Sequence, residues 1–377
     1  MTRSVAAIKE FAIGIFDGPH ATPKPSEDGP IFLGIKNVTD EGRLDFSEIR
    51  HVSEADFAKW TRRVKPQQGD IVFSYEATLH RYACIPDGFE GCLGRRMALV
   101  RPDLRKVDPR FLLYFFLSPI WRAKMEAITI TGATVNRIPL TTVPNTEVSL
   151  PGLREQVAIA EILSAYDELI ENNRRRIALL EEAARMLYRE WFVHFRFPGH
   201  EHVKVFDGLP AGWERCKVGD LLELRYGKAL KEENRTGGPI PVYGSSGIIG
   251  THQTALAAGP TIVVGRKGNV GSVYWSPVDL WPIDTAYFVP REQADLWLYL
   301  ALPSAGFQNT DSGVPGLNRN FAYSRNLIRP PESLRRTFID TVEPMFAQRT
   351  ALENYNKKLA QGRDLLLPRL MNGDIAV

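Results

Sequence analysis

The stretch Ile71–Pro86 reads IVFSYEATLHRYACIP, and the later stretch Ile262–Pro277 reads IVVGRKGNVGSVYWSP. The two stretches align without a gap, although only three positions are identical. Each consists of an apolar run, a polar loop, a second apolar run and a proline, which is typical of strands separated by a loop. A repeat that keeps its frame while its loop residues vary predicts one scaffold that recognises two different things.

A long helix follows each β-type segment. After Pro151, apolar residues recur at steps of three, four and seven positions as far as Trp191, which predicts a helix that packs against a partner helix. At ~1.5 Å per residue, its roughly 40 residues would extend on the order of 60 Å. The C-terminal stretch offers the partner, because large apolar residues recur every seven positions from Phe338 to Leu366. The predicted seam between the helices consists of Ile159, Leu163, Tyr166, Ile170, Asn173, Ile177, Leu180, Leu187, Met345, Leu352, Leu359 and Leu366.

Two asparagines interrupt the seams. Asn173 lies in the first seam and Asn356 in the second. A buried polar pair would fix the register of the helices, because a slipped alignment would leave the amides without partners. Alternatively, both asparagines face solvent at a local break in the seam. The sequence leaves both interpretations open.

These patterns predict the fold class and the domain organisation. We expect an α+β chain in which two β-rich domains are joined by two long coiled-coil helices, as an internal repeat. The predicted segments are a first β-rich domain at 1–150, a central helix at 151–195, a second β-rich domain at 196–329 and a C-terminal helix at 330–377.

The composition excludes some classes of protein. The 377 residues are 44% apolar, contain no run of about 18 apolar residues and begin without a signal-peptide hydrophobic region, so we expect a cytoplasmic protein that does not enter a membrane. The net charge of +3 permits a nucleic-acid partner without requiring one. The cysteines Cys84, Cys92 and Cys216 fit no metal or redox spacing and are interpreted as packing residues.

No catalytic motif is recognisable. A DNA adenine methyltransferase would need an Asn/Asp-Pro-Pro-aromatic motif, but the single Pro-Pro pair, Pro330–Pro331, follows an arginine. The glycine-rich stretches at 244–250 and 265–271 lack the ending of a nucleotide-binding loop. His200 and His202 have no evident third metal ligand. We therefore expect no catalytic residue, no metal site and no cofactor bound by this chain.

The polar loops of the two copies carry side chains suited to DNA. Arg266, Lys267 and Asn269 lie between glycines; arginine suits guanine O6 and N7, asparagine suits adenine, and lysine suits phosphate. Asn136–Arg137 and Asn318–Arg319 are expected in equivalent loops, and several basic residues would contact phosphate without specifying sequence. The predicted DNA contacts are Tyr75, Thr78, His80, Arg81, Asn136, Arg137, Lys228, Tyr243, Ser245, Arg266, Lys267, Asn269, Asn318 and Arg319.

Several motifs, in this order and over essentially the whole chain, resemble the specificity subunit of a type I restriction-modification enzyme. They are LPGLREQ at 150–156, LYREWFVHFRFPGHE at 187–201, LPAGWE at 209–214, PVYGSSGIIG at 241–250 and LLLPRL at 365–370. The resemblance implies two target recognition domains, each binding half of a bipartite site in double-stranded DNA. It also implies that the two helices are antiparallel and act as a ruler between the domains, which makes the chain a pseudo-two-fold internal repeat.

The resemblance also implies partner subunits. Two methyltransferase subunits would dock on the helices, and restriction/translocase subunits would join for cleavage; S-adenosylmethionine, ATP and magnesium would be bound by those partners. Two alternatives belong to other classes. One is a specificity subunit of a related methyltransferase or nuclease system, including one with its own enzymatic activity. The other is a coiled-coil adaptor without DNA specificity, which would lack the steep salt dependence of DNA binding.

Overall fold

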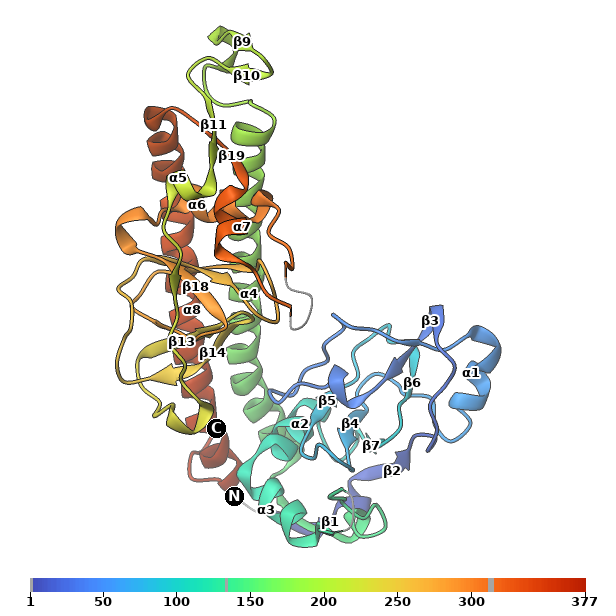
Figure 1. Cartoon of the computed structure of the whole chain (residues 1–377). Coiled ribbons are helices and arrows are strands. Elements are labelled where there is room, and N and C mark those ends of the chain that lie inside the picture. The colour runs from blue at the N-terminus through green and yellow to red at the C-terminus, as the bar shows by residue number, and fades with distance from the viewer. Residues whose placement is uncertain (1–2, 133–134, 311–314) are drawn as a thin grey trace. The chain divides into compact units, whose positions relative to one another are not determined.

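The computed structural model describes residues 3–132, 135–310 and 315–377. The chain divides into two compact units (Figure 1). The first unit comprises Met1–Asn172 and Asn356–Val377, and the second comprises Asn173–Tyr355. Both divisions fall inside the long helices, so each unit contains a β-rich part and a segment of both helices. The domain boundaries predicted from the sequence instead separate the β-rich segments from the long helices. This division of the chain stays a prediction.

The first unit contains a four-stranded sheet in the order β2-β7-β4-β5, an antiparallel pair β1-β8 and a parallel pair β3-β6. Its strands are β1 (Ser4–Ala7), β2 (Ala12–Asp17), β3 (Ser26–Leu33), β4 (Ile71–Ser74), β5 (Tyr82–Cys84), β6 (Gly91–Leu93), β7 (Met97–Pro102) and β8 (Glu147–Leu150). Its short helices are α1 (Glu54–Trp60), α2 (Pro109–Leu117) and α3 (Pro119–Ile128). Asp108 caps α2 by accepting hydrogen bonds from the amides of Arg110 and Phe111.

The second unit repeats this topology. Its four-stranded sheet has the order β12-β18-β15-β16, β11 and β19 form the antiparallel pair, and β13 pairs in parallel with β17. Its strands are β9 (Val205–Phe206), β10 (Leu209–Pro210), β11 (Glu214–Lys217), β12 (Arg225–Tyr226), β13 (Ile240–Gly244), β14 (Gly247–His252), β15 (Thr261–Gly265), β16 (Val273–Ser276), β17 (Trp281–Pro282), β18 (Ala286–Val289) and β19 (Asn326–Arg329). Its short helices are α5 (Val218–Leu221), α6 (Leu296–Ala301) and α7 (Arg319–Ser324).

The strand registers confirm the gapless alignment of the two copies. In β4-β5 Ile71 lies opposite Cys84, and in β15-β16 Ile262 lies opposite Trp275. Ile262 and Trp275 are displaced from Ile71 and Cys84 by the same number of positions in the sequence. The sequence repeat is therefore a repeat of structure, residue for residue, in this hairpin.

The two long helices are α4 (Leu153–Tyr188), which a π-helical turn extends over Arg189–Val193, and α8 (Glu332–Asn372). In the first unit the carboxylate of Asp167 lies 2.5 Å from the guanidinium of Arg363. In the second unit Glu181 lies 3.2 Å from Arg349, and the rings of Tyr188 and Phe338 are 6.2 Å apart. Residues closer to the C-terminus of α4 contact residues closer to the N-terminus of α8. The two helices therefore pair antiparallel within each unit.

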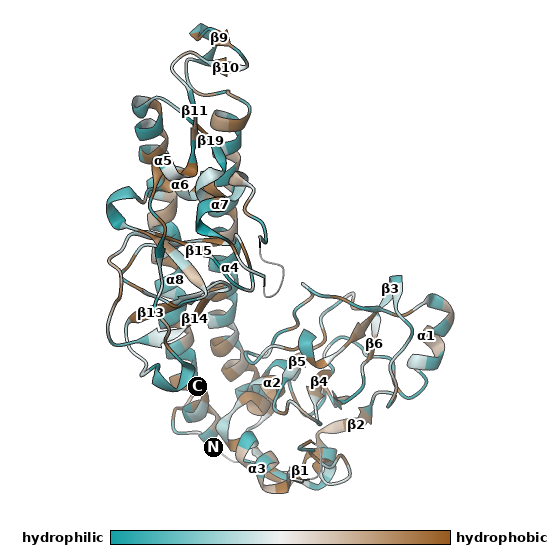
Figure 2. Ribbon diagram, viewed as in Figure 1, coloured by the Kyte–Doolittle hydropathy of each residue, from teal (hydrophilic) through white to brown (hydrophobic). Residues whose placement is uncertain are grey.

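The burial of side chains along the helices follows the heptad pattern, and apolar and polar residues alternate along both ribbons in Figure 2. None of the predicted seam residues is exposed. The seam drifts slightly along α8, where Phe346 and Leu367 are more buried than their neighbours Met345 and Leu366. Such drift is expected because a straight helix has 3.6 rather than 3.5 residues per turn.

Neither seam asparagine faces solvent. Asn173 is 4% exposed, and the side-chain amide of Asn356 donates a 3.3 Å hydrogen bond to the carbonyl of Ile170 on the other helix. The solvent-facing interpretation is therefore wrong for both residues. A hydrogen bond from α8 to one particular carbonyl of α4 disfavours slipped registers.

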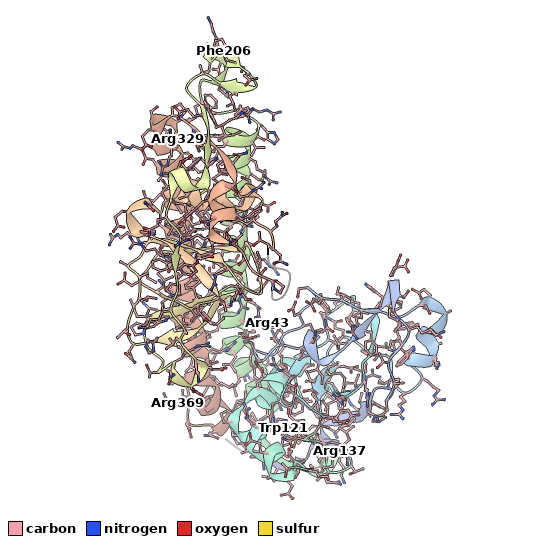
Figure 3. All side chains as sticks on the ribbon, viewed as in Figure 1. Arg43, Trp121, Arg137, Phe206, Arg329 and Arg369 are labelled. Atoms are coloured by element: carbon pink, nitrogen blue, oxygen red, sulfur yellow. The ribbon has the colours of Figure 1, made fainter. Side chains whose placement is uncertain are left out.

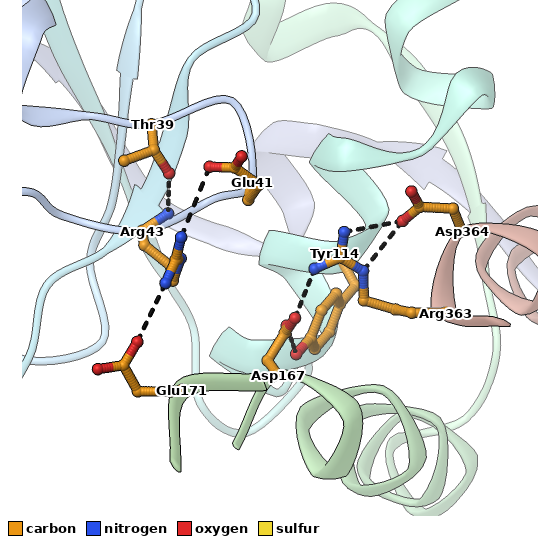
Figure 4. A network of polar contacts seen from close by, with 8 residues as sticks. All are labelled: Thr39, Glu41, Arg43, Tyr114, Asp167, Glu171, Arg363 and Asp364. Atoms are coloured by element: carbon orange, nitrogen blue, oxygen red, sulfur yellow. Dashed lines mark hydrogen bonds and ion pairs between the residues drawn. The ribbon is translucent and has the colours of Figure 1, made fainter. Parts of the chain in front are cut away.

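Polar contacts fasten the β-rich part of the first unit to its segment of the helices (Figure 4). Tyr114 of α2 and Arg363 of α8 both contact Asp167 of α4. Arg43, in the loop before α1, forms a 3.1 Å ion pair with Glu171 of α4. In the second unit the corresponding attachment is mainly apolar, because Tyr188, Phe192 and Phe338 pack in one core with the sheet. In both units the helices thus support the sheet that carries the variable loops. No helix in the described ranges is both long and apolar enough to traverse a membrane.

Candidate nucleic-acid interface

The loop after the first strand of each hairpin lies against a second loop predicted to contact DNA. In the first unit the amide of Ile138 donates a 2.8 Å hydrogen bond to the carbonyl of Tyr75. In the second unit the amide of Leu317 donates a 2.8 Å hydrogen bond to the carbonyl of Arg266. Tyr75 and Arg266 are aligned in the sequence repeat, so both copies bring the same pair of loops together.

The two Asn-Arg pairs lie in these corresponding loops, as predicted, but not at corresponding positions. The backbone of Glu76 forms an isolated antiparallel β-bridge with that of Arg137. Lys267, which is aligned with Glu76 in the repeat, forms the same kind of bridge with Gly316. Arg137 therefore matches Gly316, and the pair Asn318–Arg319 lies three positions beyond the site that corresponds to Asn136–Arg137. The shared dipeptide is therefore no evidence that these two arginines have the same role.

Asn318 has a structural role in its loop. Its side-chain oxygen accepts hydrogen bonds of 2.8 and 3.2 Å from the amides of Asn320 and Phe321, which makes it the N-cap of α7. Arg319 is the first residue of α7 and is half-buried. The cap therefore fixes where the side chain of Arg319 leaves the backbone.

A cluster of two tyrosines and two arginines forms the centre of the second unit's loops. We call Tyr226, Arg266, Tyr287 and Arg319 the Tyr226 cluster. The guanidinium carbon of Arg266 lies 5.0 Å from the ring centre of Tyr226 and 5.8 Å from that of Tyr287. The guanidinium of Arg319 lies 5.1 Å from the same Tyr226 ring. All three distances are those of cation–π contacts.

The backbone around this cluster is held firmly. The guanidinium Nη1 of Arg266 donates a 2.9 Å hydrogen bond to the carbonyl of Asp284, and its amide donates to the carbonyl of Thr285 at 2.9 Å. The hydroxyl of buried Tyr287 donates to the carbonyl of Leu317 at 2.9 Å. Burial raises the pKa of Tyr287 to about 12, so this hydroxyl keeps its proton at neutral pH.

The loop that follows Arg266 turns tightly. A side chain at Gly265 would place its Cβ 2.1 Å from the carbonyl oxygen of Asn269, so only glycine fits there. Lys267 and Asn269 are exposed beyond this turn, and their predicted contacts with DNA stay a prediction. The hydroxyl of buried Ser245 accepts a 3.4 Å hydrogen bond from the amide of Asn269 and so stabilises the turn.

Two further predicted residues of the second unit differ in exposure. Lys228 is exposed, and its carbonyl accepts a 2.9 Å hydrogen bond from the indole of Trp281. Tyr243 is 6% exposed and packs against Tyr274, with ring centres 6.4 Å apart. The contacts of Tyr243 are thus those of a core residue that supports the loops, whereas the ammonium group of Lys228 is free to meet a phosphate.

The first unit places different chemistry at the matching positions. Asp17 of β2 lies opposite Ala98, as Tyr226 lies opposite Tyr287 in the second unit. The carboxylate of Asp17 contacts His20 at 2.9 Å and Arg63 at 2.5 Å. The ring of Tyr75 is buried, and its hydroxyl lies 3.5 Å from His20. Burial, with the charges of Asp17 and Glu76, raises the pKa of Tyr75 to about 12.

The remaining predicted residues of the first unit lie around this group. Thr78 and the pair Asn136–Arg137 are exposed; Arg137 is labelled in Figure 3. Arg81 forms a 3.0 Å ion pair with Asp40. His80 is half-buried in a left-handed backbone conformation, 3.9 Å from Glu126. Of these, Arg137 is the most available cation.

A basic hollow of about 470 Å³ adjoins the same loop. Lys36, Arg50, Arg95 and Arg96 line it above a floor that includes buried Phe32. The carbonyl of Arg96 accepts a 3.2 Å hydrogen bond from the amide of Tyr75, so the hollow continues the loop surface. Within the ranges that the structure describes, no group of histidine, cysteine, aspartate or glutamate is arranged to hold a metal ion.

Sequence reasoning missed Tyr226, Asp17 and His20. Tyr226 lies in a strand of only two residues, which has too few positions to show a period. Its neighbours Arg266 and Arg319 come from distant parts of the chain, and only the sheet order brings them together. The one available signal was the alternation Leu222-Glu-Leu-Arg-Tyr226, a short β pattern that ends in an aromatic residue.

Comparisons with known proteins agree with this duplicated arrangement. The family described as Type I restriction modification DNA specificity domain matches residues 37–182 and again residues 210–318. The MjaIX type I restriction enzyme specificity subunit of Methanocaldococcus jannaschii is 23% identical, over 87% of this chain and 82% of the relative. The HindI specificity subunit of Haemophilus influenzae is 22% identical, over 82% of this chain and 87% of the relative.

A solved structure shares the fold. The crystal structure of a type I restriction-modification S subunit from M. genitalium superposes with a TM-score of 0.55, at 18% identity, and the match covers 98% of this chain and 96% of that one. Because the family matches both copies of the repeat and most of the chain, this protein belongs to the family of type I restriction-modification DNA specificity proteins.

Proposed function

We propose that this chain is the DNA-recognition subunit of a type I restriction-modification system and that each β-rich domain reads one half of a bipartite target in double-stranded DNA. The observation that carries the proposal is the pair of equivalent loop sites with different side chains. Arg266 and Tyr226 in the second unit match Tyr75 and Asp17 in the first. The same frame with different hydrogen-bonding groups suits the recognition of two different half-sites.

The chain would act with partner subunits rather than alone. Two methyltransferase subunits would bind S-adenosylmethionine and modify the target, and restriction/translocase subunits would bind ATP and magnesium. This chain would itself be non-catalytic. The relatives support this assignment, since they are named as specificity subunits of type I restriction enzymes.

The two long helices would set the distance between the half-sites. Both are continuous, with 36 residues in α4 and 41 in α8, which at ~1.5 Å per residue corresponds to about 54 and 62 Å. Their antiparallel pairing within each unit rests on ion pairs and on the Asn356 hydrogen bond as well as apolar contacts. A paired helix is stiffer than a loop and can therefore specify a spacer.

The proposal is tested by exchanging one β-rich domain. The full-length chain is produced with the methyltransferase subunits of its own system in a host without other adenine methylation, and methylated adenines are mapped by sequencing. Exchange of residues 196–329 for those of a related specificity subunit should change one half of the methylated motif and leave the other half and the spacer unchanged. The reciprocal exchange of residues 1–150 should change the other half.

Two outcomes contradict the proposal. If neither exchange altered the motif, the β-rich domains would not determine sequence. If the chain bound DNA without a bipartite preference, or bound it with no loss at higher salt, a coiled-coil adaptor would explain it better, because phosphate contacts release counterions and weaken steeply with salt.

A further inference from the structure

The Tyr226 cluster places two guanidiniums on one partly exposed ring. Tyr226 is 49% exposed, and the guanidinium groups of Arg266 and Arg319 both lie about 5 Å from the centre of its ring. Among the residues that the structure describes, neither arginine forms an ion pair with a carboxylate. Two like charges held together without a described carboxylate favour a ligand rich in hydrogen-bond acceptors.

The hydrogen bonds of Arg266 leave one edge of its guanidinium available. Nη1 donates to the carbonyl of Asp284, and the ring of Tyr226 lies within cation–π distance of the group. The side chain of Arg266 also interacts with the hydroxyl of Tyr287, and no other protein acceptor for Nε or Nη2 occurs within the described ranges. These two nitrogens form the planar fork that matches O6 and N7 of guanine in the major groove. Tyr226 limits the rotation of the fork, so less conformational entropy is lost on binding.

We infer that Arg266, positioned by Tyr226, reads a guanine in the half-site of the second β-rich domain. This inference rests on the proposed function and names the base that one of its sites recognises. Arg319 shares the ring and adds positive charge beside the fork. A backbone phosphate has the same acceptor chemistry as the guanine edge, so the experiment must distinguish these two sources.

The first domain offers no such fork at the matching place. Asp17 lies at the position equivalent to Tyr226, and its carboxylate already contacts Arg63 and His20. Tyr75 stands where Arg266 stands and is buried. The first half-site therefore serves as an internal control, because a substitution that damages only the second domain's reading should leave it intact.

The experiment measures base preference with the complete complex of this chain and its methyltransferase subunits. The probe is a library of double-stranded DNA that carries the wild-type motif with one position at a time randomised, at two salt concentrations. Arg266→Ala and Arg266→Lys should each reduce discrimination for guanine at one position of the second half-site by roughly 10- to 100-fold. Lysine keeps the charge but not the fork, so Arg266→Lys should keep the salt dependence of the wild type.

Substitutions of Tyr226 test the positioning role. Tyr226→Phe keeps the ring and should retain the guanine preference, whereas Tyr226→Leu removes it and should weaken the preference at the same position. Arg291→Ala is the matched control, since Arg291 is exposed and lies outside the cluster. Preferences in the first half-site should be unchanged in all these variants.

Several outcomes overturn the inference. If Arg266→Ala weakened binding equally for all sequences and lowered the salt dependence, Arg266 would contact phosphate. If no position of the second half-site required guanine, or if Arg266→Lys kept the preference, the fork would not be the reader. If Arg266→Ala lost the base preferences of both half-sites, the variant would be misfolded. The guanine preference of Arg266→Lys would then decide whether the fork reads the base. If the wild-type complex showed no bipartite preference, the proposed function itself would fail.

Discussion

The hydroxyl of Tyr114 donates a 2.6 Å hydrogen bond to one carboxylate oxygen of Asp167, whose other oxygen lies 2.5 Å from the guanidinium of Arg363. One carboxylate thus joins the β-rich part of the first unit to both long helices. Phe346 is the residue of α8 that corresponds to Asp167, because both lie equally far from the start of their helices. The ring of Phe346 packs against the ring of Tyr299, with ring centres 5.8 Å apart. The repeat therefore keeps a tyrosine at this junction while its partner changes from polar to apolar.

Removal of the Tyr114 hydroxyl should destabilise the first unit. Tyr114→Phe deletes a hydrogen bond to a charged group, and we expect the free energy of unfolding to fall by about 1.5 kcal/mol, at the lower end of the usual range because Asp167 is partly exposed. Urea denaturation of the full-length chain measures the change. Tyr299→Phe is the matched control and should cost less, because Tyr299 meets Phe346 through its ring. Equal losses in both variants would contradict this account.

The sequence predicted the parts of the fold that depend on local periodicity. The hairpin Ile71–Cys84 and its copy were aligned correctly because strand pairs joined by one loop carry their register in the apolar pattern. The pairing of the two long helices followed from the heptads in the same way, whereas their antiparallel orientation was expected from the family resemblance. The loops were predicted less well: the Asn-Arg pairs are offset by three positions, since loop length is not constrained by a period.

The direction in which side chains point at the ends of the strands could not be predicted from the sequence either. Tyr75 and Tyr243 were predicted as DNA contacts, yet their rings are buried. An aromatic residue next to a polar loop can point to either side, and only the packing of distant elements decides. Tyr226 is the converse case, because its contacts with Arg266 and Arg319 depend on the order of strands and on the loop before α7.

The acid sensitivity of the first unit should depend on His80. Burial, followed by the nearby charge of Arg122, lowers the pKa of His80 despite the opposing carboxylate of Glu126. As pH falls below about 6.5, the unfolded chain binds a proton that the folded chain resists, so the free energy of unfolding decreases towards acid. His80→Asn keeps a residue that tolerates the left-handed backbone and removes this titration.

We therefore expect the stability of His80→Asn to vary less with pH between 8 and 5 than that of the wild type. Urea midpoints at a series of pH values measure the difference. His202→Asn is the control, because His202 has a highly exposed side chain. A parallel pH dependence in His80→Asn and the wild type would show that His80 is not the responsible group.

Lys228 should contribute to DNA affinity without contributing to sequence choice. Its backbone is fixed by hydrogen bonds with Pro282 and Trp281, and its side chain is exposed. Lys228→Ala should weaken binding of target and unrelated DNA by the same factor and reduce the slope of log affinity against log salt by about 1. Filter binding or anisotropy of the complex at several salt concentrations measures both. Lys217→Ala, an exposed lysine on β11, is the control; a base-specific loss in Lys228→Ala would contradict a phosphate contact.

The length of the paired helices should determine the spacer in the DNA target. Insertion of three heptads after Arg175 in α4 and after Leu352 in α8 would preserve the pairing and add about 31 Å. At 3.4 Å per base pair this corresponds to about 9 base pairs, close to one DNA turn, so both half-sites would again face the same side. Methylome sequencing should then show unchanged half-sites separated by a spacer about 9 base pairs longer. The same insertion in α4 alone should abolish bipartite methylation, because it shifts the helices out of register. An unaltered spacer with the double insertion would show that the helices do not act as a ruler.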